Sequence, residues 1–208
     1  MGVLWIATAL PTCIFTRNSP GGQSAARVFA IAILPAIVCL AVGTLTMELN
    51  GAFCIWISSG LALTGMGLVA WALESRAGPL SIQTPQGRFR DSPALAGFFL
   101  LFGLATIGLP GTLSFVADDL IVSGSLDEQL HAGLLVITAT VLSGIAVMRG
   151  WFMIFGGPAA VDGPRHMILP RERIALTVVL ATLFVLGLFP APLVRSLERA
   201  AEQLLATP

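Results

Sequence analysis

The chain has 208 residues, of which 56% are hydrophobic and only 11% are charged, and its mean hydropathy is +0.90. Soluble domains carry about 25% charged residues, so this composition excludes an ordinary water-soluble domain and favours an integral membrane protein. The 11 basic residues, all arginine, balance 11 acidic residues, which excludes the net positive field that attracts nucleic acid.

Apolar stretches that match the width of a bilayer begin near the N-terminus. A spanning helix needs about 20 mostly apolar residues. Residues 3–15 are apolar but lack a preceding basic region, which favours a short membrane segment over a signal peptide. Full spans are predicted over 28–47 and 52–73, separated by a tight turn at Glu48-Leu49-Asn50-Gly51.

The next apolar stretch, residues 94–123, is too long for one straight span. A helix of about 30 residues would measure about 45 Å, half again the hydrocarbon thickness of about 30 Å. Because proline removes a backbone donor and glycine loosens the chain, Leu109-Pro110-Gly111 predicts a break near the middle. Interrupted helices at membrane depth survive where they are buried in protein or line a hydrated cavity, which points to transport.

Two more spans complete the predicted fold, over residues 131–155 and 174–188, and an amphipathic tail follows over 191–208. The predicted fold class is all-α: a polytopic transmembrane helix bundle with five full spans and a short N-terminal segment. One span is broken, and residues 1–208 form a single membrane domain. Arginines gather in the loops around 16–27, 74–92 and 156–173, so these loops are predicted to be cytoplasmic.

Asp118 and Asp119 are the polar residues of greatest functional interest, because they follow the break and precede another apolar run. An acid at membrane depth costs about 2.5 to 3.5 kcal/mol unless it is hydrated, paired or protonated. Two interpretations of Asp118 stay open: a reversible proton carrier, or a hydrated helix-end acid about 12 Å from the midplane. The two carboxyls are about 100° apart around a helix, so both cannot face one narrow path.

Glu48 and Arg149 are further candidates for a proton path, although an interfacial acid and a snorkelling arginine explain them as well. Cys13, Cys39 and Cys54 lie in apolar runs at spacings that fit no metal motif, so they are expected to pack in the interior. The sequence contains no phosphate-binding loop, metal cluster or nucleophile with a paired base. We therefore expect no cofactor, no bound metal and no active site within the chain.

The break and the acid belong to one segment, Gly108-Leu109-Pro110-Gly111-Thr112-Leu113-Ser114-Phe115-Val116-Ala117-Asp118. This segment resembles a signature of the antiporter-like membrane subunits of respiratory complex I. The resemblance is to the subunit-4 (M) type, which is shared with multisubunit sodium/proton antiporters and membrane-bound hydrogenases. In that family the segment breaks a helix, and a glutamate normally occupies the position of Asp118. Further agreement over about residues 52–195 comes from Pro93, Phe155-Gly156, Pro170-Arg171-Glu172 and Gly187-Leu188-Phe189-Pro190.

The resemblance implies similarity to the C-terminal third of such a subunit, in the inner membrane of a bacterium. This part holds the second broken helix and the outer proton half-channel, so Asp118 would be the terminal carrier facing the periplasm. The implied partners are other membrane subunits of a quinone oxidoreductase-like complex. The chain departs from the family because the first broken helix, with its lysine and paired glutamate, has no counterpart. Ser58 and Ser59 also stand where relatives often have histidine or lysine.

Three functions are therefore compatible with the sequence. The first is a proton-translocating membrane subunit, or half of one, that works beside other membrane subunits. The second is a structural subunit that keeps the fold but conducts nothing, which the lack of lysine favours. The third is a subunit that transports Na⁺, another cation or bicarbonate on the same fold.

Overall fold

The structure is a computed structural model that describes residues 46–78, 80, 85–128, 130–158 and 168–197. These residues form helices and no strand, which confirms the all-α fold class for the described part of the chain. The helices are α3 (Thr46–Ala77), α4 (Pro93–Thr106), α5 (Leu113–Glu128), α6 (Leu130–Phe155), α7 (Pro170–Leu188) and the short helix Ala191–Leu197. The predicted segment 3–15, nearly all of 28–47 and the tail beyond 197 lie outside the described residues.

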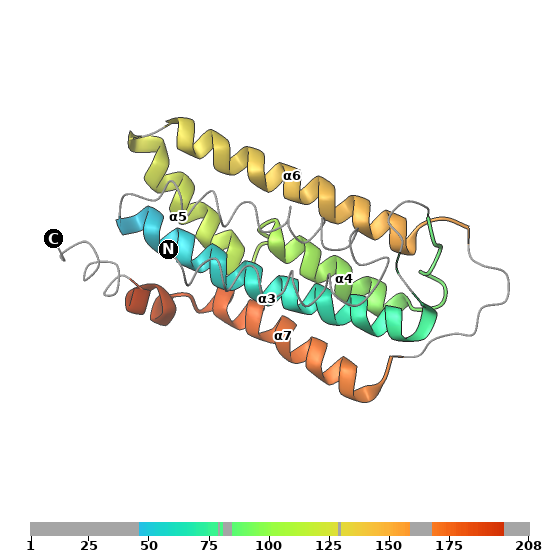
Figure 1. The fold of residues 1–208 in the computed structure, drawn as a ribbon. Helices are drawn as coiled ribbons and strands as arrows, with labels where there is room; N and C mark the ends of the chain where they lie inside the picture. The colour runs from blue at the N-terminus through green and yellow to red at the C-terminus, as the bar shows by residue number, and fades with distance from the viewer. Residues whose placement is uncertain (1–45, 79, 81–84, 129, 159–167, 198–208) are drawn as a thin grey trace, which may run out of the picture.

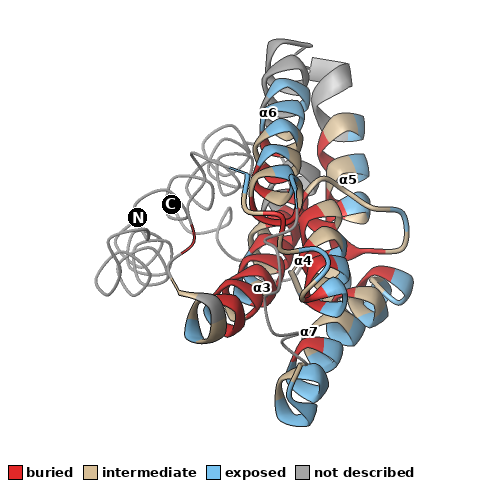
Figure 2. Ribbon diagram, turned by 90° about the vertical axis from the view of Figure 1, so that its right-hand side faces the viewer, coloured by how far each residue is buried: buried red, intermediate tan, exposed pale blue. Residues whose placement is uncertain are grey.

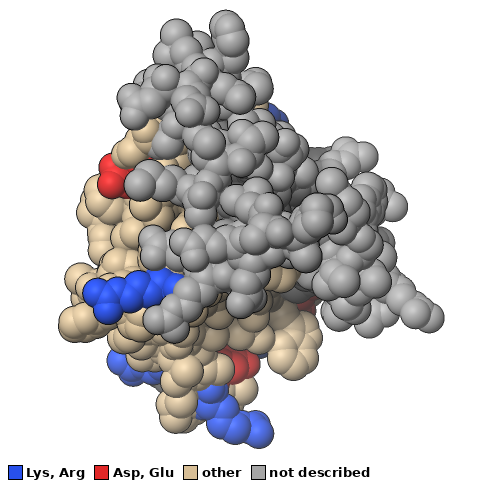
Figure 3. Space-filling view, turned by 90° about the vertical axis from the view of Figure 1, so that its left-hand side faces the viewer, with Lys and Arg blue, Asp and Glu red and all other residues tan. Residues whose placement is uncertain are grey.

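The long helices run side by side, with α3 in the middle of the bundle (Figure 1). Helix α3 packs against α4, α5 and α7, and α6 packs against α4 and α5. Figure 2 shows buried residues where α3, α4 and α5 face one another and exposed residues on the outward sides of α6 and α7. On the face drawn in Figure 3, separate arginine and acidic side chains stand out from a described surface that is otherwise uncharged.

Small residues let these helices approach closely, as in membrane helix packing generally. A Cβ added at Gly65 would lie 2.4 Å from the ring of Phe102, and one at Gly103 would lie 2.3 Å from Cγ1 of Val147. The glycines thus bring α3 onto α4 and α4 onto α6. Cys54 is fully buried between α3 and α5, as expected, whereas Cys13 and Cys39 lie outside the described residues.

The tight turn predicted over Glu48-Leu49-Asn50-Gly51 is wrong, because α3 continues through all four residues. Gly51 faces α5, where a Cβ would lie 2.4 Å from Cγ1 of Ile121 and 3.1 Å from the carbonyl oxygen of Ala117. Asn50 is also buried, with 3% of its surface exposed. The glycine therefore serves close packing of two helices, and the polar residue beside it does not mark a loop.

The helical structure is interrupted between Thr106 and Leu113, over the segment that contains the predicted break. Gly108 has φ +91°, and the N–H of Leu109 donates to the carbonyl of Leu104 at 3.1 Å. This is the Schellman arrangement, in which a glycine in the left-handed region ends a helix and proline commonly follows. The stop is therefore made by Gly108 together with Pro110. That α4 and α5 are two halves of one membrane span stays a prediction.

The remaining helix bounds differ slightly from the predicted spans. Helix α6 begins one residue earlier than expected, α7 begins at Pro170 instead of 174, and α5 extends beyond 123 to Glu128. By length and composition, Phe53–Arg76 is the single described stretch that could cross a membrane unaided. The pair Pro170–Leu188 and Ala191–Leu197 would be a second if its 77° bend lies within one span.

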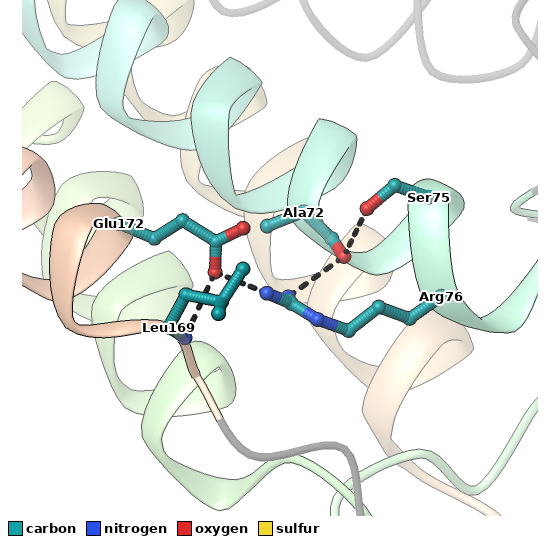
Figure 4. Close-up of polar contacts among 5 residues, drawn as sticks. All are labelled: Ala72, Ser75, Arg76, Leu169 and Glu172. Carbon is teal, nitrogen blue, oxygen red and sulfur yellow. Dashed lines mark hydrogen bonds and ion pairs between the residues drawn. The ribbon is translucent and has the colours of Figure 1, made fainter.

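One end of the bundle is fastened by polar contacts between segments far apart in sequence. Arg76 of α3 forms an ion pair with Glu172 of α7, and it donates a second hydrogen bond to the carbonyl of Ala72 at 2.9 Å (Figure 4). The carboxylate of Glu172 also accepts the N–H of Leu169 at 3.2 Å, which caps the first turn of α7. The C-terminus of α3 and the N-terminus of α7 are thereby held together.

The loop before α4 caps the C-terminus of α6. Four consecutive N–H groups of this loop donate to carbonyls at the end of α6, over 2.8 to 3.3 Å. The donor and acceptor pairs are Gln86 with Met153, Gly87 with Gly156, Arg88 with Ile154, and Phe89 with Phe155. Helix ends leave four carbonyls without intrahelical partners, and this loop satisfies them. Burial in the loop lowers the pKa of Arg88, an effect that the nearby carboxylates of Asp91 and Glu74 oppose.

Candidate functional site

The Asp118 side chain lies directly against the end of α4. It belongs to the second turn of α5 and is half-buried. A Cβ added at Gly108 would lie 2.7 Å from Oδ2 of Asp118. Helical side chains lean toward the N-terminus of their helix, and this direction carries the carboxyl back over the interruption. The predicted acid therefore lies against the predicted break.

Sequence reasoning assigned no role to Gly108, although it belongs to the segment that carries the resemblance. The feature that marks it is a glycine at the end of an apolar helix with a proline two residues later. The left-handed φ explains why a glycine stands there, and the nearby carboxyl of Asp118 explains why a side chain would not fit. Gly108 is thus part of the site geometry.

A buried polar pair lies one helical turn from the carboxyl. Ser114, four residues before Asp118 on the same side of α5, forms a hydrogen bond with Ser58 of α3. Both serines are almost completely buried, with 0% and 3% of their surfaces exposed for Ser58 and Ser114. Within the described residues Asp118 itself forms no hydrogen bond and no ion pair. The arrangement is a carboxyl without a charged partner, on the same helix as the Ser114 hydroxyl and one turn away from it.

The interrupted segment satisfies part of its own backbone. The Thr112 hydroxyl donates to the carbonyl of Leu109 at 2.6 Å, and the Thr112 N–H donates to the same oxygen at 3.0 Å. Of the predicted break residues, Leu109 and Gly111 are half-buried and Pro110 is exposed. This carbonyl therefore has partners within the segment, as buried backbone groups require.

The other predicted site residues are not brought to Asp118 by any described contact. Asp119 is exposed on a different side of α5, as the 100° rotation between neighbouring residues requires. Arg149 is exposed on α6, two turns before its end. Glu48 lies in the first turn of α3, and its side chain is outside the described part of the structure.

Curated relatives carry the names of complex I membrane subunits, although no family model matches the sequence. NADH-quinone oxidoreductase subunit M of Mycobacterium tuberculosis is 29% identical over 163 residues, which cover 78% of this chain and 30% of the relative. Subunit 13 of the enzyme from Thermus thermophilus is 28% identical over 73% of this chain and 32% of its own length. The chain thus spans about a third of the length of the curated relatives it matches.

Solved structures of two protein complexes contain chains with the same fold. One is respiratory complex I from Thermus thermophilus with bound NADH, with a TM-score of 0.69 and 22% identity over 88% of this chain and 37% of the other. The second is the Mrp complex from Dietzia sp. DQ12-45-1b, with a TM-score of 0.70 and 15% identity over 98% of this chain and 47% of the other. These findings confirm the predicted resemblance: the chain is similar to proteins named as subunit M or chain 4 of NADH-quinone and NAD(P)H-quinone oxidoreductases, and the similarity covers part of their length.

Proposed function

We propose that this chain is a proton-translocating membrane subunit, or part of one, in a complex I-like or antiporter-like assembly. Asp118 is its proton carrier, in the outer half-channel. The observation that carries the proposal is the contact between the Asp118 carboxyl and Gly108, at the point where helical structure is interrupted. The names of the relatives support the class of complex, and the geometry supports the choice of residue.

Asp118 has the surroundings that a reversible carrier needs. An ionised carboxyl without a charged partner is costly at membrane depth, so its charge depends on the water that reaches it. Backbone groups at the interruption lie outside the hydrogen-bond pattern of a helix, and such groups are tolerated within a membrane where they line a hydrated cavity. In this proposal α4 and α5 are two halves of one span, and water at their junction exchanges protons with Asp118.

The distribution of charge supports an outward position for the carrier. The contacts of Arg76 with Glu172, and of the 86–89 loop with α6, gather the described arginine-bearing loops at one end of the bundle. These loops are proposed to be cytoplasmic, by the positive-inside rule. Asp118 lies beyond the interruption from that end, because α4 runs away from it and α5 continues onward (Figure 1).

Glu48 and Arg149 are proposed as secondary groups of the path. Gly51 packs against Ile121, so Glu48, three residues earlier in α3, lies at the outer end of the α3–α5 contact. In this proposal Glu48 passes protons between Asp118 and the outer surface. Arg149 lies toward the proposed cytoplasmic end of α6, where a fixed positive charge repels protons that approach from that side. Asp119, exposed on α5, is proposed to remain outside the narrow path.

The test replaces Asp118 by Asn in the complete complex, reconstituted into liposomes with a pH-sensitive dye inside. Asparagine keeps the shape of the side chain but cannot carry a proton, so we expect proton uptake to fall to the leak of empty liposomes. Asp119→Asn is the matched control and should keep the flux of the unaltered complex. Full flux with Asp118→Asn, in a complex that contains all its subunits, would contradict the proposal.

A structural subunit is the second candidate function, and the lack of lysine in the sequence favours it. In that case both asparagine variants would leave flux unchanged, while loss of the chain would prevent assembly. Transport of Na⁺ or bicarbonate is separated by repeating the measurement with each ion omitted. If the flux disappears when one of these ions is omitted, that ion is the transported species in place of protons.

A further inference from the structure

Helix α7 lies directly on the backbone of the interrupted segment. A Cβ added at Gly187 would lie 2.3 Å from the carbonyl oxygen of Gly111, and 2.4 and 2.6 Å from the backbone carbon and Cα of Thr112. These atoms belong to the main chain, so no side-chain rotation relieves the contact. The ring of Phe184, one turn earlier in α7, lies 3.7 Å from the Cβ position of Gly111. Glycine at 187 is therefore a condition for the contact.

This contact covers backbone groups of the interrupted segment that would otherwise need water or another protein chain as a neighbour. Backbone groups outside a helix are tolerated in lipid only where protein or water covers them. On one side, Gly108 is covered by the Asp118 carboxyl, and on another, Gly111 and Thr112 are covered by α7. Gly187 itself is buried. The segment is therefore in contact with the Asp118 carboxyl at Gly108 and with α7, which comes much later in the sequence, at Gly111 and Thr112.

We propose that Gly187 and Phe184 are positioning residues for proton transfer, because they hold α7 against Gly111 and Thr112 and so close that side of the interruption to water. Among the described residues, this leaves the side of Gly108 as the route by which water reaches Asp118. This inference rests on the proposed function of Asp118. Gly187 touches neither the carboxyl nor the proton, and it acts through the placement of α7.

Two variants open the contact in different ways. Gly187→Ala forces α7 away from the main chain of the segment, and Phe184→Ala removes the ring that packs beside Gly111. Gly97→Ala is the matched control, because Gly97 is also helical and an added Cβ there meets nothing within 4 Å. The variants are made in the complete complex, and Phe184→Ala keeps the test available if Gly187→Ala prevents assembly.

The first measurement is amide hydrogen exchange of the peptide that contains residues 107–112, followed by mass spectrometry. The Thr112 N–H, which is bonded to Leu109, reports opening of the segment. We expect exchange to accelerate about tenfold in Gly187→Ala and to rise in Phe184→Ala, with Gly97→Ala unchanged; tenfold corresponds to about 1.4 kcal/mol in the opening equilibrium. Unchanged exchange in both α7 variants would overturn the inference.

The second measurement is proton flux of the same complexes across a range of pH. A changed flux or a shifted pH profile in the α7 variants, with faster exchange, supports a positioning role. Faster exchange with the flux and pH profile of the unaltered complex would overturn it. Asp118→Asn separates the two proposals, because it tests the proton carrier without disturbing α7. If its flux is normal, the proposed function fails. Faster exchange on adding Gly187→Ala to this variant would still support the contact between α7 and the interrupted segment.

Discussion

Gly108→Ala adds one methyl group at the point where α4 ends and the Asp118 carboxyl folds back. The backbone has φ +91°, and the new Cβ would lie 2.7 Å from Oδ2 of Asp118. An L-residue in the left-handed region costs about 1 to 2 kcal/mol. Moving the aspartate off its preferred rotamer costs about 0.5 to 1.5 kcal/mol more. We therefore expect Gly108→Ala to destabilise the protein by about 1.5 to 3.5 kcal/mol.

Two other glycines separate these causes. Gly78 has φ +77° with nothing within 4 Å of an added Cβ, so Gly78→Ala should show only the backbone cost of about 1 to 2 kcal/mol. Gly97 is helical and also has open space, so Gly97→Ala should be neutral or stabilise by up to about 1 kcal/mol. The midpoints of thermal unfolding in mild detergent would rank the three variants.

A double-mutant cycle with Asp118→Ala then isolates the contact with the carboxyl. In that background the carboxyl is gone, so Gly108→Ala should cost no more than Gly78→Ala, and the coupling should be about 1 kcal/mol. An equal effect of Gly108→Ala with and without the carboxyl would show that the Asp118 side chain does not contribute to the cost. An effect of Gly108→Ala equal to that of Gly78→Ala in the otherwise unaltered protein would show the same.

Two further predictions concern polar contacts between helices. Ser58→Ala or Ser114→Ala leaves the other buried hydroxyl without its partner and should lower the free energy of unfolding by about 1 to 3 kcal/mol. The double variant should lose less than the sum of the single losses, as measured by unfolding in detergent. Strictly additive losses would contradict the pairing. Arg76→Gln breaks the partly exposed ion pair with Glu172 and should lower the free energy of unfolding by about 1 kcal/mol at low salt and by less at 1 M salt. An equal loss at both salt concentrations would contradict an electrostatic origin.

The sequence predicted the helices whose ends carry strong chemical markers. Helix α6 ends at Phe155, where the predicted span also ended before two glycines and a proline. The interruption near Pro110 was predicted because an unbroken helix would exceed the bilayer and because proline and glycine occur together. Asp118 was singled out because an acid close to an apolar run is costly.

The features that sequence reasoning missed depend on contacts between distant segments. A glycine next to a polar residue indicates a turn or a close helix contact equally well, and at Gly51 only the position of Ile121 decides between them. Gly187 looked like part of a helix ending, whereas its role comes from a segment some 75 residues earlier. Patterns in a single sequence describe local conformation, so they do not reveal which distant segment packs against a glycine.

The bonds between the loop before α4 and the end of α6 also bear on biosynthesis. A ribosome makes the four N–H donors at 86–89 before it makes the acceptor carbonyls at 153–156. When α6 emerges, its last carbonyls can exchange water for partners that are already present, and no later part of the chain is needed. The order of translation thus agrees with the order in which these four bonds can form.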